Sequence, residues 1–237
     1  MFKVTNYVMH FAPLGVFAMI AYTVGSYGIA MLIPLGKLIL SVAGATALFI
    51  AVVATIASAF TKINFFHLIL ALKDILFLAF STASSEAALP GAMKRLHRLG
   101  VPEATVTFVM PTGYSFNLDG STLYSSAGIL FIAQLYGIAM PIEQQLLVMV
   151  TLMLSTKGIA GVPGAGIIVV AATAAAFNLP TEGVAILLGI DRILDMIRTI
   201  CNVCGNCMAT VVVSCWEKEL NKEQFNRLYK EFREEKL

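Results

Sequence analysis

Five polar or charged side chains recur at helical spacing in the last apolar stretch of the chain. Asp191, Asp195, Arg198, Asn202 and Asn206 fall within one arc of about 80° when residues advance by roughly 100° along a helix. A charge at the centre of a membrane helix costs about 2.5–3.5 kcal/mol on insertion scales, so charged residues there are candidates for a functional role. We therefore expect one polar face on an otherwise apolar helix.

Asp195 and Arg198 are suited to a zwitterion that carries an additional acid. A carboxylate accepts hydrogen bonds from an ammonium group, and a guanidinium fork holds a carboxylate at two points. The pair predicts an acidic amino acid as ligand. For Asp191, a purely structural ion pair with Arg198 is an open alternative.

The segment FNLDGST is a second group of polar residues, with Asn117, Asp119 and Ser121. Asn and Asp two residues apart, followed by Gly, unwind a helix readily and free backbone carbonyls that can bind a cation beside the Asp oxygen. The alternative is an ordinary turn, since Asp-Gly is a common turn pair. Because residues 104–142 carry no other formal charge, we favour a broken helix.

The composition excludes most soluble classes of protein. The chain of 237 residues is 58% hydrophobic and 13% charged, against about 25% charged in a typical soluble domain. Of its 30 charged residues, 12 lie in residues 217–237. Such a chain needs the lipid bilayer as its main solvent, which argues against a soluble enzyme, a nucleic-acid binder and a disulfide mini-protein.

Charge-free runs predict the membrane spans, and the chain start, without a clear cleavage site, is expected to be a retained span. The runs are residues 4–36, 38–61, 104–118, 120–142, 158–181 and 183–216, the last with Arg192 and the charges described above. Four cysteines (Cys201, Cys204, Cys207 and Cys215) share the last run. Their spacing spreads the thiols around a helix, so we expect apolar packing rather than a metal site.

Two further segments are expected to enter the membrane and return. Lys73 and Lys94 flank a segment barely one span long with Ser84, Ser85 and Glu86 at its middle, and a hairpin keeps both basic flanks in the cytoplasm. Residues 142–182 have acidic flanks and a Gly- and Pro-rich reversal at 161–166, which predicts a hairpin from outside. Two such segments favour an inverted-repeat transporter core; two kinked helices are the alternative.

Five motifs in this order resemble the glutamate transporter family, the dicarboxylate/amino acid:cation symporters: PLGVFAMIAY, STASSEAALP, PTGYSFNLDGSTLY, STKGIAGVPGAG and DRILDMIRTICNVCGN. The resemblance covers nearly the whole chain. It implies an all-α polytopic membrane protein with an inverted-repeat core and two re-entrant helical hairpins. It begins at the family's fifth helix, so we expect the first four helices to be absent and the chain to be a fragment.

The resemblance and the charge-free runs together divide the chain into three parts. Residues 1–61 are expected to form a scaffold helix and a first core helix, and residues 217–237 a charged cytoplasmic tail that is a solvated or interfacial amphipathic helix. The transport core at 62–216 is expected to contain an inner hairpin at 65–98, a broken helix at 103–136, an outer hairpin at 141–178 and a substrate helix at 183–216.

The resemblance also implies two sets of site residues. Substrate-binding residues would be Ser84, Ser85, Ser121, Val162, Gly166, Asp195, Arg198, Thr199 and Asn202, with Asp195 on the amino group and Arg198 on the side-chain carboxylate. Cation-coupling residues would be Glu86, Gly113, Ser115, Asn117, Asp119, Thr156, Asn202 and Asn206. Neutral amino acid members would have little use for Arg198, and C4-dicarboxylate members little use for Asp195.

Two positions favour protons over sodium as the coupling ion. Sodium-coupled relatives carry Asp at the position of Asn206, and an amide lacks the charge that holds sodium well. Glu86 stands where many relatives have serine, which is similar to the proton-coupled glutamate/aspartate branch; a buried carboxyl there could carry the proton, or Glu86 could be only a hydrogen-bonded tip residue. A sodium ion at Asn117 and Asp119 stays open.

These expectations describe a secondary active symporter of L-glutamate and L-aspartate, driven by protons or sodium, that works by an elevator movement with hairpin gates. The resemblance implies a homotrimer in the cell inner membrane for the full-length protein, with no cofactor and no nucleic-acid partner. A channel would need a ring of like charges or a continuous polar pore. The opposite charges of Asp195 and Arg198 argue against a channel. An intramembrane enzyme would need a base beside a nucleophile, and no motif provides one.

Overall fold

The computed structural model describes residues 2–157, 164–225 and 227, and these residues form helices with no β-strand. The all-α class is therefore confirmed for this part of the chain. The reversal predicted at 161–166 lies only partly within it, and Val162 lies outside the described residues.

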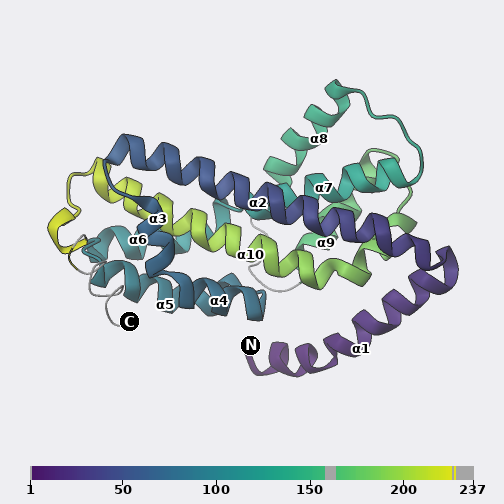
Figure 1. Cartoon of the computed structure of the whole chain (residues 1–237), viewed down its shortest axis with the longest axis horizontal. Coiled ribbons are helices and arrows are strands. Elements are labelled where there is room, and N and C mark those ends of the chain that lie inside the picture. Colours follow the sequence, from purple (N-terminus) through teal and green to yellow (C-terminus); the bar gives the residue numbers. More distant parts are fainter. Residues whose placement is uncertain (1, 158–163, 226, 228–237) are drawn as a thin grey trace.

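Two long helices run along the molecule in the same direction (Figure 1). They are α2 (Leu32–Thr61) and α10 (Glu182–Trp216), which pack against each other. The 35 residues of α10 extend over about 50 Å at 1.5 Å per residue, enough to contact most other elements. Before α2, helix α1 (Phe2–Tyr27) and the short 3-10 helix η1 (Ile29–Met31) are joined at Gly28, whose φ of 83° suits glycine.

The other helices divide between the two halves of α10. On one side, at the left of Figure 1, lie α3 (Phe65–Ala71), α4 (Lys73–Thr82), α5 (Ser85–Arg98) and α6 (Glu103–Phe116). On the other lie α7 (Asp119–Leu135), α8 (Ile142–Ser155) and α9 (Ala165–Ala176). Helices α3–α10 lie within the ranges predicted for the two hairpins, the broken helix and the substrate helix, to within one residue. The assignment of the helices to a static scaffold and a moving core stays a prediction.

Two apolar cores flank the middle of α10. One joins the end of α2 and helices α3–α6 to α10 residues such as Val203, Cys204 and Val211. The other joins the start of α2 and helices α7–α9 to α10 residues such as Leu187 and Leu194. Residues 195–202 of α10 lie between these cores along the helix. The middle of the polar arc predicted for α10, which contains Asp195 and Arg198, is thus held between two packed apolar regions.

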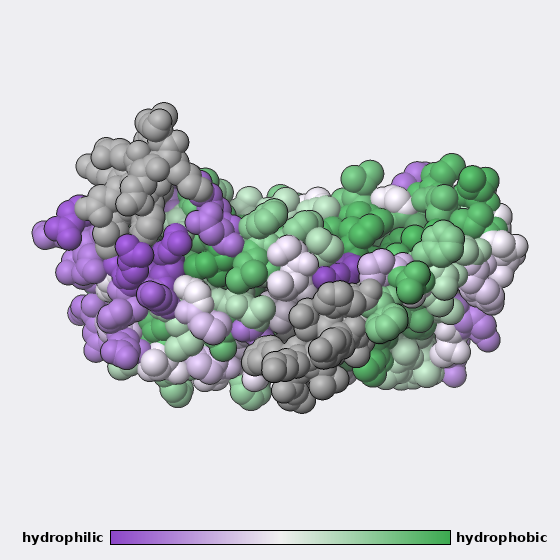
Figure 2. Space-filling view, turned by 90° about the horizontal axis from the view of Figure 1, so that it is seen from below, coloured by the Kyte–Doolittle hydropathy of each residue, from purple (hydrophilic) through white to green (hydrophobic). Residues whose placement is uncertain are grey.

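Apolar side chains cover much of the face seen in Figure 2, while polar ones gather at one end of it. That end carries α5, α6 and the segment after α10. By length and composition alone, the continuous segment Ile29–Thr61 could cross a membrane, and so could α3 and α4 together if their 62° bend lies within one span. The other predicted spans stay predictions.

The first residues of the tail are docked, which corrects the expectation of a solvated or interfacial helix for this part. Leu220 and Phe225 are buried in the core that includes the end of α2. Lys222 Nζ donates to the carbonyl of Thr61 at 3.1 Å, and Asn221 N donates to the carbonyl of Gly100 at 3.2 Å. The free energy gained by burying the apolar ring of Phe225 outweighs the preference of the charged neighbouring residues for water.

Candidate functional site

The interruption between α6 and α7 lies beside the middle of α10. Asn117 and Leu118 leave the helical conformation, with ψ of 74° and 57°. The first amide groups of α7 then need acceptors from outside the helix. The Asn202 side chain of α10 supplies one, since its Oδ1 accepts from Gly120 N at 2.8 Å and from Ser121 N at 3.4 Å. An amide of α10 therefore caps the broken helix.

Close approach of α7 to α10 requires glycine at the break. A β-carbon added to Gly120 would lie 2.3 Å from the Arg198 carbonyl oxygen and 2.7 Å from Cys201 Cβ. This approach brings Ser121 Oγ within 3.0 Å of both Arg198 Nη1 and Asn202 Nδ2, which donate to it. Ser121, Arg198 and Asn202 thus form one buried hydrogen-bonded group.

Asp195 and Arg198 form an ion pair inside the protein. Arg198 Nε donates to Asp195 Oδ1, and the residues are 2% and 4% exposed, so neither faces the apolar exterior. The second carboxylate oxygen of Asp195 accepts from the backbone N–H of Gly164 at 2.9 Å, at the start of α9. The charged pair therefore lies between the broken helix and the α8–α9 pair.

Asp191 has a different partner from the one considered in the sequence. Tyr124 of α7 donates its hydroxyl proton to Asp191 Oδ1 at 2.5 Å, and the ring of Tyr124 lies 5.9 Å from the Arg198 guanidinium carbon. A β-carbon on Gly166 would lie 3.0 Å from both Arg198 Nη1 and Tyr124 Cε1. Tyr124 therefore connects Asp191, Arg198 and the start of α9, and the alternative of an Asp191–Arg198 ion pair is not what the structure contains.

A second polar cluster lies one turn further along α10. The Asn117 amide is 3.2 Å from Asn206 Oδ1 and, in its flipped orientation, 3.1 Å from both carboxylate oxygens of Asp119. Gly113 and Gly205 leave room for these groups. A β-carbon at Gly113 would lie 2.3 Å from Asn206 Oδ1, and one at Gly205 would lie 3.0 Å from Asp119 Oδ2. The buried Nδ2 of Asn206 has no hydrogen-bond partner. Oxygen-rich groups of this kind suit a hard cation.

Two helix pairs, α4–α5 and α8–α9, contact α10 through residues at their inner ends. Between α4 and α5, Ala83 adopts the left-handed conformation with φ of 49°, and Ser84 caps α5 by accepting from Ala87 N at 3.3 Å. Gly164 has the same conformation just before α9, with φ of 78°. Arg192 of α10 donates to the carbonyls of Ser81 and Thr82 at 3.2 and 3.3 Å. The α4–α5 reversal thus contacts α10 as well.

The structure brings together some predicted site residues and separates others. Ser121, Gly166, Asp195, Arg198 and Asn202 lie in one contact group, and Gly113, Asn117, Asp119 and Asn206 in the second.

The remaining predicted residues lie apart from these groups or are bonded elsewhere. Ser85 is buried in the first turn of α5, and Thr199 donates to the carbonyl of Asp195 in its own helix at 2.7 Å. Thr156 is buried, with its hydroxyl 3.0 Å from that of Thr122. Glu86 and Ser115 are exposed, so the expectation of a buried carboxyl at Glu86 is corrected for this chain; a side chain at the first turn of α5 can point outward.

Sequence reasoning missed three partners of the site. Tyr124 shares a face of α7 with Ser121, three residues earlier, and this spacing could have identified it. Thr122 gives no comparable sign. Arg192 is a charge inside the apolar run 183–216, and this could have identified it as a candidate. The cysteines pack as expected, with Cys204 and Cys207 in an apolar core. Within the described residues, no three His, Cys, Asp or Glu side chains could hold a metal ion together.

Residues 1–216 match the profile of the sodium:dicarboxylate symporter family. The chain belongs to this family, whose helical membrane proteins are symporters rather than enzymes, as the motifs of the sequence predicted.

Individual relatives refine the comparison. The chain is 52% identical over 94% of its length to the proton/sodium-glutamate symport protein of Geobacillus stearothermophilus, covering 53% of that protein. It is 49% identical over 94% of its length to the proton/glutamate-aspartate symporter of Escherichia coli, covering 51% of it. It is 42% identical over 96% to the C4-dicarboxylate transport protein of Paracoccus denitrificans, covering 50%. The chain thus spans about half the length of these relatives.

Proposed function

We propose that the chain carries the substrate site of a multi-pass, inner-membrane symporter that moves L-glutamate and L-aspartate into the cell. The buried ion pair of Asp195 and Arg198 is the observation that supports this most directly. In the substrate-bound state the two side chains separate to hold opposite charges of the ligand, the ammonium group on Asp195 and the side-chain carboxylate on Arg198. Without substrate they neutralise each other, which limits the cost of burying them.

The α8–α9 pair acts as the gate over this site. Its Gly164 N–H donates to Asp195, and a β-carbon added at Gly166 would meet the Arg198 guanidinium. Substrate that engages either side chain must alter those contacts, so ligand binding and the position of the pair are linked. In this proposal both helix pairs, α4–α5 and α8–α9, are re-entrant hairpins of an inverted-repeat core. That core moves as an elevator past a static scaffold, and the full-length protein is a homotrimer.

Protons or sodium supply the driving force. The cluster of Asn117, Asp119 and Asn206 offers oxygen atoms to a cation, but a single carboxylate limits its charge. Glu86 is the second carboxyl in the proposed coupling set, at the exposed start of α5. The names of the relatives include both proton and sodium. We favour proton coupling, in which Glu86 takes up and releases the proton.

Transport of C4-dicarboxylates is a second candidate, favoured by the 42% identity to a protein named for it. Asp195 separates the two functions, because its buried carboxylate would repel a dianion that has no ammonium group. An acidic amino acid satisfies both members of the charged pair, so it is the preferred substrate.

Uptake by the full-length protein in proteoliposomes tests the proposal. Labelled glutamate should accumulate when a pH gradient is imposed at equal sodium, and D195A and R198A should each abolish accumulation. The exposed Lys94 of α5 offers a matched control, so K94A should leave uptake unchanged. Uptake driven by sodium alone would overturn the proton assignment. Unchanged uptake in both site variants would remove the ion pair from the site.

A further inference from the structure

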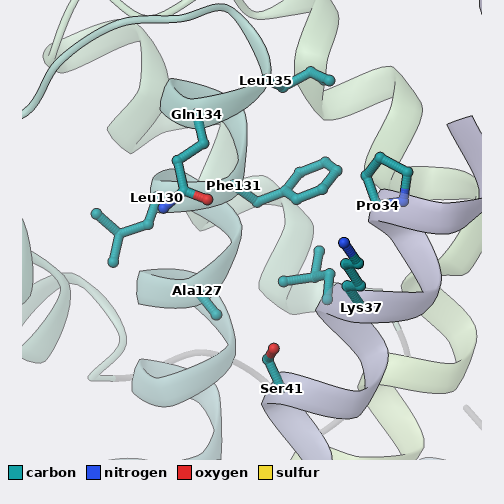
Figure 3. A pocket seen from close by; sticks show the side chains of 9 residues that line it. Pro34, Lys37, Ser41, Ala127, Leu130, Phe131, Gln134 and Leu135 are labelled. Atoms are coloured by element: carbon teal, nitrogen blue, oxygen red, sulfur yellow. The ribbon is translucent and has the colours of Figure 1, made fainter.

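A groove between α2 and α7 contains the one formal charge of the segment Ile29–Thr61. It has a volume of about 500 Å³ and shares no residue with the polar clusters on α10. Figure 3 shows Lys37 and Ser41 on α2 and Phe131 reaching across from α7. The lining residues are Pro34, Lys37, Leu38, Ser41, Ala127, Leu130, Phe131, Gln134 and Leu135.

Lys37 lacks an anionic partner within the described part of the chain. No carboxylate lines the groove, and the side chain is exposed. A lysine in an apolar span is costly unless its ammonium group reaches the interface or meets an anion. The groove therefore offers a cation that needs a partner, in surroundings that are otherwise mainly apolar.

Lys37 lies near one end of α2, close to where we expect the lipid headgroups. It lies five residues after the first residue of α2, about 7.5 Å along the helix axis. Tyr27 ends α1 and Tyr136 directly follows α7 at the same end, and their side chains are exposed. Exposed tyrosines typically mark the membrane interface. An ammonium group just below that level can reach a phosphate in the headgroup layer.

We propose that this groove binds an anionic phospholipid. The phosphate accepts hydrogen bonds from Lys37 Nζ, and Ser41, one helical turn deeper on the same face, donates to an ester carbonyl of the glycerol linkage. One acyl chain lies along the apolar part of the groove, on Leu130 and Phe131. The lipid thereby fills the space between α2 and α7 and covers a charge that has no anionic partner among the described residues.

Lipid binding to the purified, delipidated protein in detergent tests the proposal, with native mass spectrometry as the readout. Dioleoyl phosphatidylglycerol should bind, while dioleoylglycerol without the phosphate and glycerol phosphate without the acyl chains should each bind at least tenfold more weakly. Equal binding of dioleoylglycerol would overturn the role of the phosphate. Equal binding of glycerol phosphate would overturn that of the acyl chain.

Variants assign the binding to this groove. K37M should weaken phosphatidylglycerol binding about fivefold, which corresponds to about 1 kcal/mol for one basic residue at a membrane surface. A127F should block the groove while leaving Lys37 in place, and K94M on the exposed face of α5 should have no effect. Wild-type binding in both K37M and A127F would refute the site.

A photo-crosslinker identifies the occupant directly. With p-benzoylphenylalanine in place of Gln134, irradiation of the protein in native membranes should attach a phospholipid to the groove. A cross-link to a protein segment, from a second copy or from another part of a longer chain, would contradict the proposal. These outcomes are independent of glutamate uptake, so failure here would leave the proposed transport function standing.

Discussion

The close contact between α7 and α10 makes a sharp prediction for Gly120. Replacing it with alanine places a carbon 2.3 Å from the Arg198 carbonyl oxygen, whereas such atoms normally stay about 3.3–3.6 Å apart. The start of α7 must therefore move away from α10 by about 1 Å. Overpacking of this kind costs about 1–3 kcal/mol, and the rigid backbone on the other side favours the upper end of that range.

Gly44 supplies the matched control. It lies inside α2, and an added β-carbon would meet no atom within 4 Å. Alanine is a better helix former than glycine by about 0.8–1.0 kcal/mol, so G44A should be neutral or stabilising. The same chemical change is therefore expected to have opposite signs at the two positions.

Thermal unfolding of the purified protein in detergent measures both effects. With about 2–4 °C per kcal/mol for a chain of this size, Tm should fall by roughly 6–12 °C in G120A and rise by up to about 4 °C in G44A. Displacement of α7 also lengthens the bonds from Gly120 and Ser121 to Asn202, so G120A should lose glutamate binding. A Tm of G120A at or above that of wild type would refute the packing argument.

Three further predictions concern a partner of the site, the docked tail and the carboxyl at the start of α5. Y124F leaves the buried Asp191 without its hydroxyl donor and should destabilise the protein by about 1.5–3 kcal/mol, with little added effect when Asp191 is already Ala, as a double-mutant cycle of Tm would show. F225A empties a buried site and should cost about 3–5 kcal/mol, whereas F108A, on a ring that is 72% exposed, should cost far less; equal Tm values would contradict the docking of the tail. E86Q should abolish uptake driven by a pH gradient but preserve glutamate exchange, and unchanged pH-driven uptake would exclude Glu86 as proton carrier.

Helical periodicity predicted the polar face of α10, because all the residues that form this face lie in one continuous segment of the sequence. Asp195 and Arg198 repeat at helical spacing, and the cost of exposing charges to lipid implies that they face inward. The break at Asn117 and Leu118 was similarly local, since Asn, Asp and Gly disfavour a continuous helix there. These parts of the fold follow from the properties of short segments.

Contacts between distant segments did not follow from the sequence in the same way. The hydroxyl of Tyr124 reaches Asp191 only because α7 and α10 pack closely at Gly120, and no property of either segment specifies that partner. Phe225 is one of three aromatic residues in a tail where 12 of 21 residues are charged, so composition predicted solvation while its ring is buried. The exposure of Glu86 depends on how α5 starts after its N-cap, which spacing alone leaves undetermined.

Substrate discrimination at Asp195 tests the proposed function most directly. The measurement is the affinity of the purified protein for L-aspartate and for succinate, which differs from it by the lack of an ammonium group, in wild type and D195N. Loss of a buried charged hydrogen bond of about 1.5–3 kcal/mol predicts that the wild-type preference for aspartate falls by roughly tenfold to a hundredfold in D195N. An unchanged preference in D195N would contradict a role for this carboxylate in holding the amino group.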